Sequence, residues 1–311
     1  MNVKKALVTG ANGFVGSAVC RMLTNQKVEV IAVVRNPESS IKNIEGIDHM
    51  KIIYCDMQDY KSLREKISDD EIDIVYHFAW MGSAGNKRGD YSTQLRNIEY
   101  SLDLIKTVHD MGCNRMVFAA SIMEYEVHDA IECNVNVGLG SIYSTAKLSC
   151  DYMMYILCHN IGIEYIRCII SNIYGPLEES PRLINTSIRK IMNNEKVSFS
   201  PGEQMYDFIY IDDAAEMFCL LGDNGKSGEN YYIGTQHPKK LKYFLAELRD
   251  VVNEEAEIGI GEIPFDGVSI NYDAIDLASV ERDTGYIPKV SFSDGIKKTV
   301  EWMREMANGE F

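Results

Sequence analysis

Short apolar runs alternate with longer amphipathic stretches over the first half of the chain. The apolar runs predict strands at Lys5–Thr9, Val28–Val34, Lys51–Tyr54, Ile74–Phe78, Met116–Ala120 and Glu164–Ile170. The stretches with helical spacing predict helices at Gly13–Asn25, Tyr60–Ile67, Ser92–Met111 and Tyr143–Asn160. This alternation predicts an α/β protein, a Rossmann-type doubly wound parallel sheet of about six or seven strands covered by helices.

The pattern becomes less regular beyond Asn172, where glycine and proline interrupt it at Gly175-Pro176, Pro201-Gly202, Pro264 and Pro288. This change predicts a smaller, partly inserted C-terminal substrate domain. We expect a dinucleotide-binding domain over 1–171 plus about 207–235. The substrate domain is then expected over about 172–206 plus 236–311.

A glycine-rich turn joins the first predicted strand to the first predicted helix. It reads Thr9-Gly10-Ala11-Asn12-Gly13-Phe14-Val15-Gly16. Glycines at such a junction let the backbone approach a pyrophosphate closely, and the helix N-terminus attracts its charge. The turn therefore predicts a dinucleotide site made by Thr9, Gly10, Asn12, Gly13, Phe14, Val15 and Gly16.

The segment Tyr143-Ser144-Thr145-Ala146-Lys147 carries the candidate chemistry. Residues four apart lie on one face of a helix, and an ammonium group at that distance favours the phenolate form of a tyrosine. The spacing alone is common on surface helices. Following a glycine-rich turn, it indicates nicotinamide redox chemistry.

Composition excludes several classes of partner. The 311 residues include 31 Lys and Arg against 46 Asp and Glu, a net charge of -15 that disfavours nucleic acid and acidic membranes as partners. No apolar run approaches the roughly 18 residues that span a bilayer, and no signal-peptide core follows Met1, so we expect a cytoplasmic protein. Eight cysteines without a C-x-x-C pair predict neither disulfides nor a metal site.

Arg35, at the end of the second predicted strand, bears on the choice of coenzyme. An acidic residue at this place commonly binds the adenosine ribose, whereas an arginine suits a 2′-phosphate. We therefore favour NADP(H), with NAD(H) as the other possibility. Asp56 follows the third predicted strand, where it can accept from an adenine amino group or form a turn.

The chain resembles the extended short-chain dehydrogenase/reductase family, in particular its NAD-dependent epimerase/dehydratase members that modify nucleotide sugars. Besides the two motifs above, further segments follow the family's order: Asp56-Met57-Gln58-Asp59, His77-Phe78-Ala79-Trp80, Asn97, Ser121, Asn172-Ile173-Tyr174-Gly175-Pro176, Asp207-Phe208-Ile209-Tyr210-Ile211-Asp212-Asp213, Gly285-Tyr286-Ile287-Pro288 and Gly295 to Trp302. Such an order over nearly the whole chain is more specific than any single motif.

The resemblance implies roles for individual residues. Tyr143 is the expected general acid/base on a sugar oxygen, Lys147 supports it and binds the nicotinamide ribose, and Ser121 orients the same oxygen. Asn172 is expected near the phosphate or sugar of the substrate. The further cofactor contacts implied are Asp56, Met57, Phe78, Ala79, Trp80 and Asn97. Members of the family usually form homodimers through paired helices.

The residues after Ser121 narrow the type of reaction. A dehydratase of this family has an acidic pair there, but this chain has Ile122-Met123, and aliphatic side chains exchange no proton. We expect Glu124, one position later, to point elsewhere. The favoured reaction is a 4-ketoreductase that transfers hydride from NADPH to C4 of a keto sugar, because Arg35 suits the soluble reductant. A 4-epimerase with retained NAD is the alternative.

The expected diphosphate anchor is missing. Family members often carry an arginine just before the Asp207 position and another after the Pro264 position, and both grip a diphosphate. This chain has Tyr206 and Phe265 there. Candidate replacements are Lys87, Arg88, Arg182, Arg189 and Lys190, and Tyr206 itself is a candidate substrate contact.

Two further alternatives arise from this departure and from the fold. A reductase of a small non-sugar ketone would need no diphosphate anchor. A non-catalytic nucleotide sensor would need no proton-transfer set, and the intact Ser121, Tyr143 and Lys147 argue against it.

Overall fold

The computed structural model describes residues 3–67, 71–138, 140–265 and 267–308. Its centre is a seven-stranded sheet whose neighbouring strands are all parallel, in the order β11-β6-β5-β4-β1-β2-β3. The strands are β1 (Lys5–Thr9), β2 (Glu29–Val34), β3 (Met50–Tyr54), β4 (Ile74–His77), β5 (Arg115–Ser121), β6 (Glu164–Ile170) and β11 (Asn230–Ile233). The predicted α/β doubly wound fold is confirmed.

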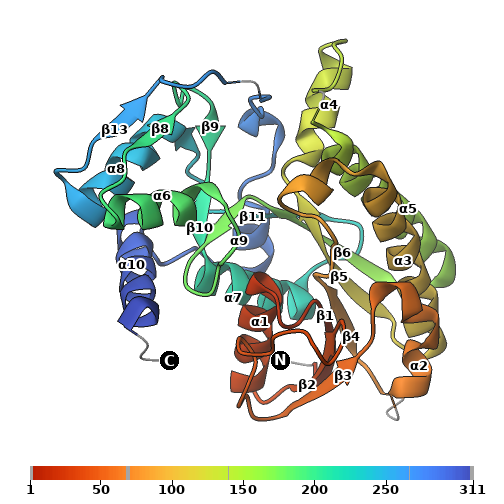
Figure 1. Cartoon of the computed structure of the whole chain (residues 1–311). Helices are drawn as coiled ribbons and strands as arrows, with labels where there is room; N and C mark the ends of the chain where they lie inside the picture. Colours follow the sequence, from red (N-terminus) through yellow and green to blue (C-terminus); the bar gives the residue numbers. More distant parts are fainter. Residues whose placement is uncertain (1–2, 68–70, 139, 266, 309–311) are drawn as a thin grey trace.

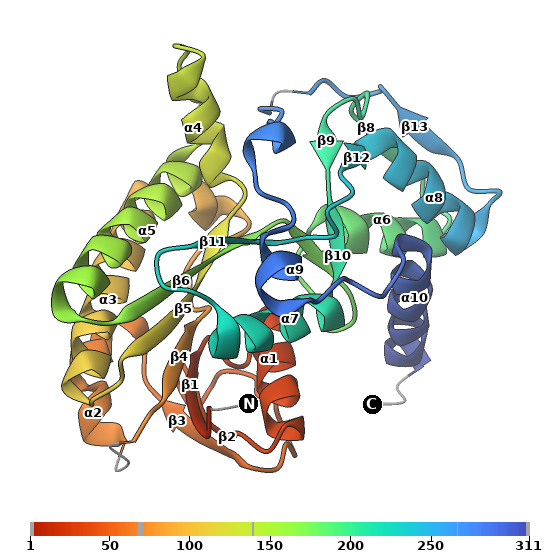
Figure 2. The same cartoon turned by 180° about the vertical axis from the view of Figure 1, so that it is seen from behind.

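Helices cover both faces of this sheet (Figures 1 and 2). One face carries α1 (Phe14–Asn25), α7 (Ile211–Asn224) and α9 (Ser279–Thr284). The other carries η1 (Met57–Ser62), α2 (Leu63–Lys66), α3 (Tyr91–Asp110) and α5 (Ile142–Ile161). Alternate side chains of β1 face opposite layers, with Leu7 in one core cluster and Val8 in the other. Because both faces are buried, the interiors of the strands are mostly apolar instead of alternating regularly with polar residues.

A second group of elements lies beside the carboxyl ends of the strands (Figure 1). It contains α6 (Leu183–Met192), α8 (Leu241–Asn253), α10 (Phe292–Asn308) and η3 (Tyr272–Ala274). Its short strands pair as β7 (Asn172–Tyr174) with β10 (Phe208–Tyr210), β8 (Val197–Phe199) with β13 (Ile258–Ile260), and β9 (Met205–Tyr206) with β12 (Lys239–Lys240). One apolar cluster runs from Ala6 in the sheet to Leu245 in α8. The domain boundaries stay a prediction.

Two connections near the carboxyl ends of the strands matter for the site. The short helix η2 (Asn86–Gly89) follows β4, and α4 (Glu124–Glu132) follows β5 and projects away from the sheet (Figure 2). The helix predicted at Tyr60–Ile67 is instead the 3-10 helix η1 followed by the single turn of α2. Its first turn is capped by Asp56, whose carboxylate accepts from Gln58 N at 3.2 Å.

Within the described residues, no helix is long and apolar enough to cross a membrane. In the same part of the chain, no three His, Cys, Asp or Glu side chains are grouped so that they could hold a metal ion. All eight cysteines are unpaired, and Cys133 is the exposed one.

Candidate active site

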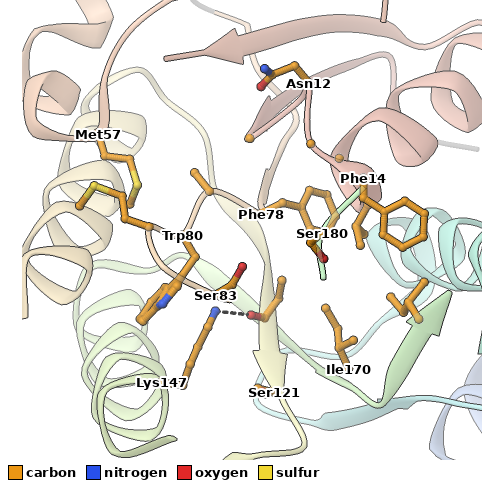
Figure 3. Close-up of a pocket in the computed structure, with 18 of the residues that line it drawn as sticks. Asn12, Phe14, Met57, Phe78, Trp80, Ser83, Ser121, Lys147, Ile170 and Ser180 are labelled. Atoms are coloured by element: carbon orange, nitrogen blue, oxygen red, sulfur yellow. Dashed lines mark hydrogen bonds between the residues drawn. The ribbon is translucent and has the colours of Figure 1, made fainter. Parts of the chain in front are cut away.

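A cavity of about 410 Å³ lies over the glycine-rich turn, at the carboxyl ends of β1, β4 and β5. Figure 3 shows Met57 and Trp80 on one side of it and Phe14 and Ile170 on the other. The sequence-predicted residues that line it are Gly10, Asn12, Gly13, Phe14, Val15, Gly16, Arg35, Met57, Phe78, Ala79, Trp80, Ser121, Tyr143, Lys147 and Arg182. Residues distant in sequence are thus brought to the point where the strand order reverses, the usual ligand crevice of such sheets.

Glycine is required at two positions of the turn for steric reasons. Gly10 has φ +67°, and a Cβ there would lie 2.8 Å from Ala79 N. A Cβ on Gly16 would lie 2.3 Å from Gly10 O. The turn therefore packs too closely against its neighbours for side chains at Gly10 and Gly16, and the phosphate site expected over it stays a prediction.

Arg35 and Asp56 lie together at one end of this cavity. Arg35 Nε is 4.0 Å from Asp56 Oδ2, and the Arg35 side chain is 62% exposed. Arg35 lines the cavity, whereas Asp56 caps η1 beside it. These are the two positions expected from the sequence at the adenosine end of a dinucleotide lying on the glycine-rich turn.

Thr9 and Asn97 lie behind the cavity wall. Thr9 Oγ1 shares a hydrogen bond of 2.7 Å with His77 Nδ1 and accepts from Ala79 N at 3.3 Å. The Asn97 side chain forms hydrogen bonds with both backbone groups of Met81. Its Oδ1 accepts from Met81 N at 2.9 Å, and its Nδ2 donates to Met81 O at 2.8 Å. Both residues hold the segment after β4 in place instead of lining the cavity.

His77 completes this support as a neutral imidazole. Ser101 Oγ donates to Asn97 O at 2.7 Å, so it accepts from His77 Nε2 at 2.9 Å. Burial, with Lys147 nearby, lowers the pKa of His77 to about 3. His77 is therefore a structural donor and acceptor at neutral pH.

Lys147 is fixed by a carbonyl and two rings. Its Nζ donates to Ala119 O at 2.8 Å, the hydrogen bond drawn in Figure 3. The same nitrogen lies 3.9 Å from the centre of the Trp80 ring and 4.7 Å from that of Phe118. Its charge is therefore held at the cavity floor, one helical turn from Tyr143.

Ser121 ends β5 with its hydroxyl in both cavities described here. Its Oγ accepts from Met123 N at 3.2 Å, and its N donates to Glu124 Oε1 at 2.8 Å. The hydroxyl hydrogen can then donate to a ligand, as the family resemblance implied.

Glu124 points away from the cavity, as expected from the strand end. Its other oxygen accepts from Arg167 Nη2 at 2.6 Å, and Arg167 Nε lies 2.5 Å from Asp151 Oδ2. Burial, reinforced by Glu124, raises the pKa of Asp151. Glu124 is wholly buried in this network, so its carboxylate cannot act as the acid of an elimination.

A second cavity of about 440 Å³ adjoins the first and shares Ser121 and Tyr143 with it. Asn172, Arg88, Arg182 and Tyr206 also line it. Burial lowers the pKa of the Arg88 guanidinium and raises that of the Tyr206 phenol. The cations that the sequence proposed as replacements for the missing arginines thus include two that reach a cavity.

The other candidate replacements lie elsewhere. Lys87, Arg189 and Lys190 are exposed and line neither cavity. Phe265 is 42% exposed and also lies outside both.

The lining residues that were not predicted from the sequence include the polar side chains of Ser83, Glu178, Ser180 and Asn185. Glu178 is buried, with Oε2 3.7 Å from Arg182 Nε, so it offsets part of that cation. Among the described residues, Ser180 Oγ and Asn185 Oδ1 are buried without a hydrogen-bond partner, although buried polar groups usually have one. For Glu178, Ser180 and Asn185, the signal in the sequence is their polar character soon after Gly175-Pro176.

The segment after β2 reaches across the first cavity. Asn12 Nδ2 donates to Ser40 O at 2.9 Å, and Asn43 Nδ2 donates to Asn12 O at 3.2 Å. Lys42 forms an ion pair with Glu179, beside Glu178 and Ser180. This pair joins two segments more than a hundred residues apart over the rim of the cavity.

Comparison with known proteins shows which family the chain resembles. Residues 6–234 match the model of the NAD dependent epimerase/dehydratase family. The dTDP-glucose 4,6-dehydratase 1 of Escherichia coli K12 is 26% identical over 96% of this chain and 92% of its own length.

Two solved structures share the fold. One is UDP-N-acetylglucosamine 4-epimerase from Methanobrevibacter ruminantium M1, with TM-score 0.82, 20% identity, and coverage of 98% of this chain and 100% of the other. The second is UDP-glucose 4-epimerase from Thermotoga maritima, with TM-score 0.80, 22% identity, and coverage of 97% and 99%.

Proposed function

This chain belongs to the NAD-dependent epimerase/dehydratase family of extended short-chain dehydrogenases/reductases and is an NAD(P)-dependent enzyme of that type. We propose that it is a nucleotide-sugar 4-ketoreductase. The observation that carries the proposal is that Ser121 and Tyr143 line both cavities, while Lys147 lines the first. Both hydroxyl-bearing residues therefore border the space that a substrate in the second cavity shares with the dinucleotide crevice.

The chain's own residues supply the proton chemistry. Ser121 donates a hydrogen bond to the C4 oxygen and orients it, and Tyr143 gives that oxygen a proton. Lys147, held by Ala119 O, keeps a positive charge near the phenol. The bound nicotinamide supplies the hydride to C4. Reduction of a ketone to an alcohol needs these two transfers and no further acid.

Elimination of the kind that the 4,6-dehydratase relatives are named for is disfavoured in this chain. Ile122 and Met123 follow Ser121, and the Glu124 carboxylate is bound to Arg167 and Ser121 N. Glu178 lines the second cavity, but its two oxygens face Ser180 N and Arg182. Each of these carboxylates is thus held by hydrogen-bond or ion-pair partners of the chain.

We propose a nucleotide diphosphate sugar as substrate, bound in the second cavity. Asn172 and Arg182 are polar groups there that suit a sugar and a diphosphate. We also propose a homodimer formed through α3 and α5. Their outward faces expose Tyr91, Leu95, Tyr152, Met153 and Ile156 by 45 to 68% each, an apolar surface that favours burial.

The 4-epimerase is the second candidate, and one observation favours it. The Lys42–Glu179 pair and the Asn12 contacts bridge the rim of the first cavity, which suits a cofactor that stays bound between turnovers. NAD is then the coenzyme in place of NADP.

One experiment separates the candidates. The purified protein is denatured, any released dinucleotide is identified, and the refolded or dinucleotide-free protein is assayed with NADPH on a nucleotide-linked 4-keto-6-deoxy sugar. NADPH consumption that depends on the nucleotide portion supports the ketoreductase. Retained NAD with interconversion of C4 epimers supports the epimerase, and reduction of small ketones without a nucleotide contradicts both.

A further inference from the structure

Arg88 lies against the face of the proposed acid/base. Its guanidinium carbon is 4.0 Å from the centre of the Tyr143 ring. Trp80 meets the same phenol edge-on, with ring centres 6.2 Å apart, and Trp80 in turn carries Lys147 on its own face. The Tyr143 ring is therefore in direct contact with the Arg88 cation, and it also contacts the Trp80 ring, which has the Lys147 cation on its face.

Arg88 forms no ion pair with any carboxylate among the described residues. Its Nη1 donates to Ser83 O at 3.0 Å. Burial lowers the pKa of Arg88 and Arg182 nearby adds repulsion, while the more distant Glu126 offsets part of this effect. A partly buried cation without an ion-pair partner is costly, so negative charge that forms in contact with it is stabilised.

The loop that carries Arg88 is fixed by a tight turn at Gly82 and by hydrogen bonds from Gln94. Gly82 has φ +70°, and a Cβ at that position would lie 2.7 Å from Lys87 O. The amide of Gln94, a buried residue, donates to Gly82 O at 3.1 Å and to Lys87 O at 3.0 Å, while its oxygen accepts from Trp80 Nε1 at 2.9 Å. One side chain thus positions both the Arg88 loop and the ring that supports Lys147.

The charged and titratable groups around the phenol come from several elements. Lys147 is on its own helix, Arg88 on η2, and Tyr206 and Arg182 lie across the second cavity. Glu126 of α4 accepts from Ser144 Oγ at 2.7 Å and from Ser141 Oγ, the residues that flank Tyr143. The Glu126 carboxylate is held by these hydroxyls, and Arg88 is the cation in contact with the ring.

We propose that Arg88 stabilises the phenolate of Tyr143, the form left when this side chain has given its proton to the C4 oxygen. The inference rests on the proposed role of Tyr143 as proton donor. In that step the phenol O–H bond breaks, the proton forms a bond with the alkoxide oxygen, and the negative charge stays on the ring system under Arg88. The contact changes from cation–π to an ion pair at the moment of proton transfer. Arg88 is thus a positioning residue that acts through Tyr143.

The test is a titration that needs no substrate. The phenolate absorbance of Tyr143 is measured against pH as the difference between each protein and its Tyr143→Phe counterpart, in wild type, Arg88→Gln, Arg88→Lys and Lys87→Gln backgrounds. We expect the titration midpoint to rise by about one pH unit in Arg88→Gln, as loss of a desolvated cation–π contact implies. Arg88→Lys should restore about half of that shift, and Lys87→Gln, an exposed neighbour outside both cavities, should leave the midpoint unchanged.

The outcomes separate the inference from the proposed function. An unchanged midpoint in Arg88→Gln overturns the inference, and a higher KM with an unchanged pH profile then makes Arg88 a substrate anchor alone. A shifted midpoint in a protein that reduces no keto sugar leaves the inference standing and overturns the ketoreductase. If Arg88→Gln does not fold, Arg88→Lys provides the test, because it keeps a positive charge. A midpoint in Arg88→Lys equal to that of the wild type then overturns the inference, and a partial rise supports it.

Discussion

Arg35 Nε lies 4.0 Å from Asp56 Oδ2, beside the adenosine end of the proposed dinucleotide crevice. The Asp56 carboxylate therefore offsets only part of the Arg35 charge. A 2′-phosphate bound there would lie near both side chains. The coenzyme preference depends on which charge dominates, and the exposed guanidinium can turn toward a phosphate more readily than the capping carboxylate can turn away.

We expect Arg35→Ala to weaken NADPH binding by about tenfold to a hundredfold, the loss of one charge-assisted hydrogen bond of about 1.5 to 3 kcal/mol. NADH binding should change little. Fluorescence titration of both coenzymes measures this, with Lys51→Ala on β3, an exposed cation outside the cavity, as the control. An equal effect on NADPH and NADH would remove the case for a phosphate contact.

Tyr143→Phe should lower kcat by about a hundredfold to ten-thousandfold, the usual contribution of general acid catalysis, and leave the coenzyme Kd nearly unchanged. Steady-state kinetics and coenzyme titration on one preparation measure both quantities. Tyr152→Phe, on the same helix but 45% exposed, is the matched control. Retained turnover in Tyr143→Phe would transfer the acid/base role to another group.

Lys42→Glu should speed dinucleotide release by about twofold to fivefold, because an exposed ion pair contributes up to about 1 kcal/mol. The double change Lys42→Glu with Glu179→Lys should restore the slow rate by reversing the pair. Stopped-flow displacement at low salt measures the rates, and high salt should shrink the difference. If release is unaffected in both variants, the bridge across the rim does not retain the cofactor.

His77 should lower the free energy of unfolding at acidic pH. Its pKa is lowered to about 3 in the fold by burial, against an ordinary value of 6.5, so the unfolded chain binds more protons between these limits. Stability contributed by this group is present above the ordinary value and falls as pH falls, by about 1.4 kcal/mol per pH unit within that window.

His77→Gln keeps hydrogen-bonding groups toward Thr9 and Ser101 but does not titrate. Urea unfolding between about pH 6 and pH 4 should therefore give a slope of stability against pH that is about 1.4 kcal/mol per unit shallower than in the wild type. His109→Gln, at the exposed end of α3, is the control. Equal slopes in wild type and His77→Gln would show that this imidazole is protonated in the folded protein.

Ile156→Glu should dissociate the proposed homodimer, because a charge on α5 would be buried against the partner's helices. Light scattering at several concentrations measures the mass. Ile131→Glu on α4 changes a residue that is 69% exposed and lies off the α3 and α5 faces, so it should leave the mass unchanged. A wild-type protein that is already monomeric at all concentrations would contradict this proposal.

Much of the fold was predictable because its signals are local. Six of the seven sheet strands were predicted from apolar runs, and the bounds of Glu164–Ile170 and Lys5–Thr9 agree with the structure. The glycine-rich turn and the Tyr143 to Lys147 spacing are likewise short patterns with a steric or helical cause. The helix predicted near Tyr60–Ile67 is present, but it consists of a 3-10 helix capped by Asp56 followed by a single α-helical turn.

Local residue order is enough to predict the layered sheet, the glycine-rich turn and the spacing of Tyr143 and Lys147, because each depends on neighbouring residues. The packing of distant segments fixes which cations reach the cavities, that Arg88 lies on the Tyr143 ring, and that Glu124 pairs with Arg167. These contacts join positions 43 or more residues apart, and loop packing at the carboxyl ends of the strands brings them together. No periodicity records such a contact, since the partners share neither an element nor a spacing.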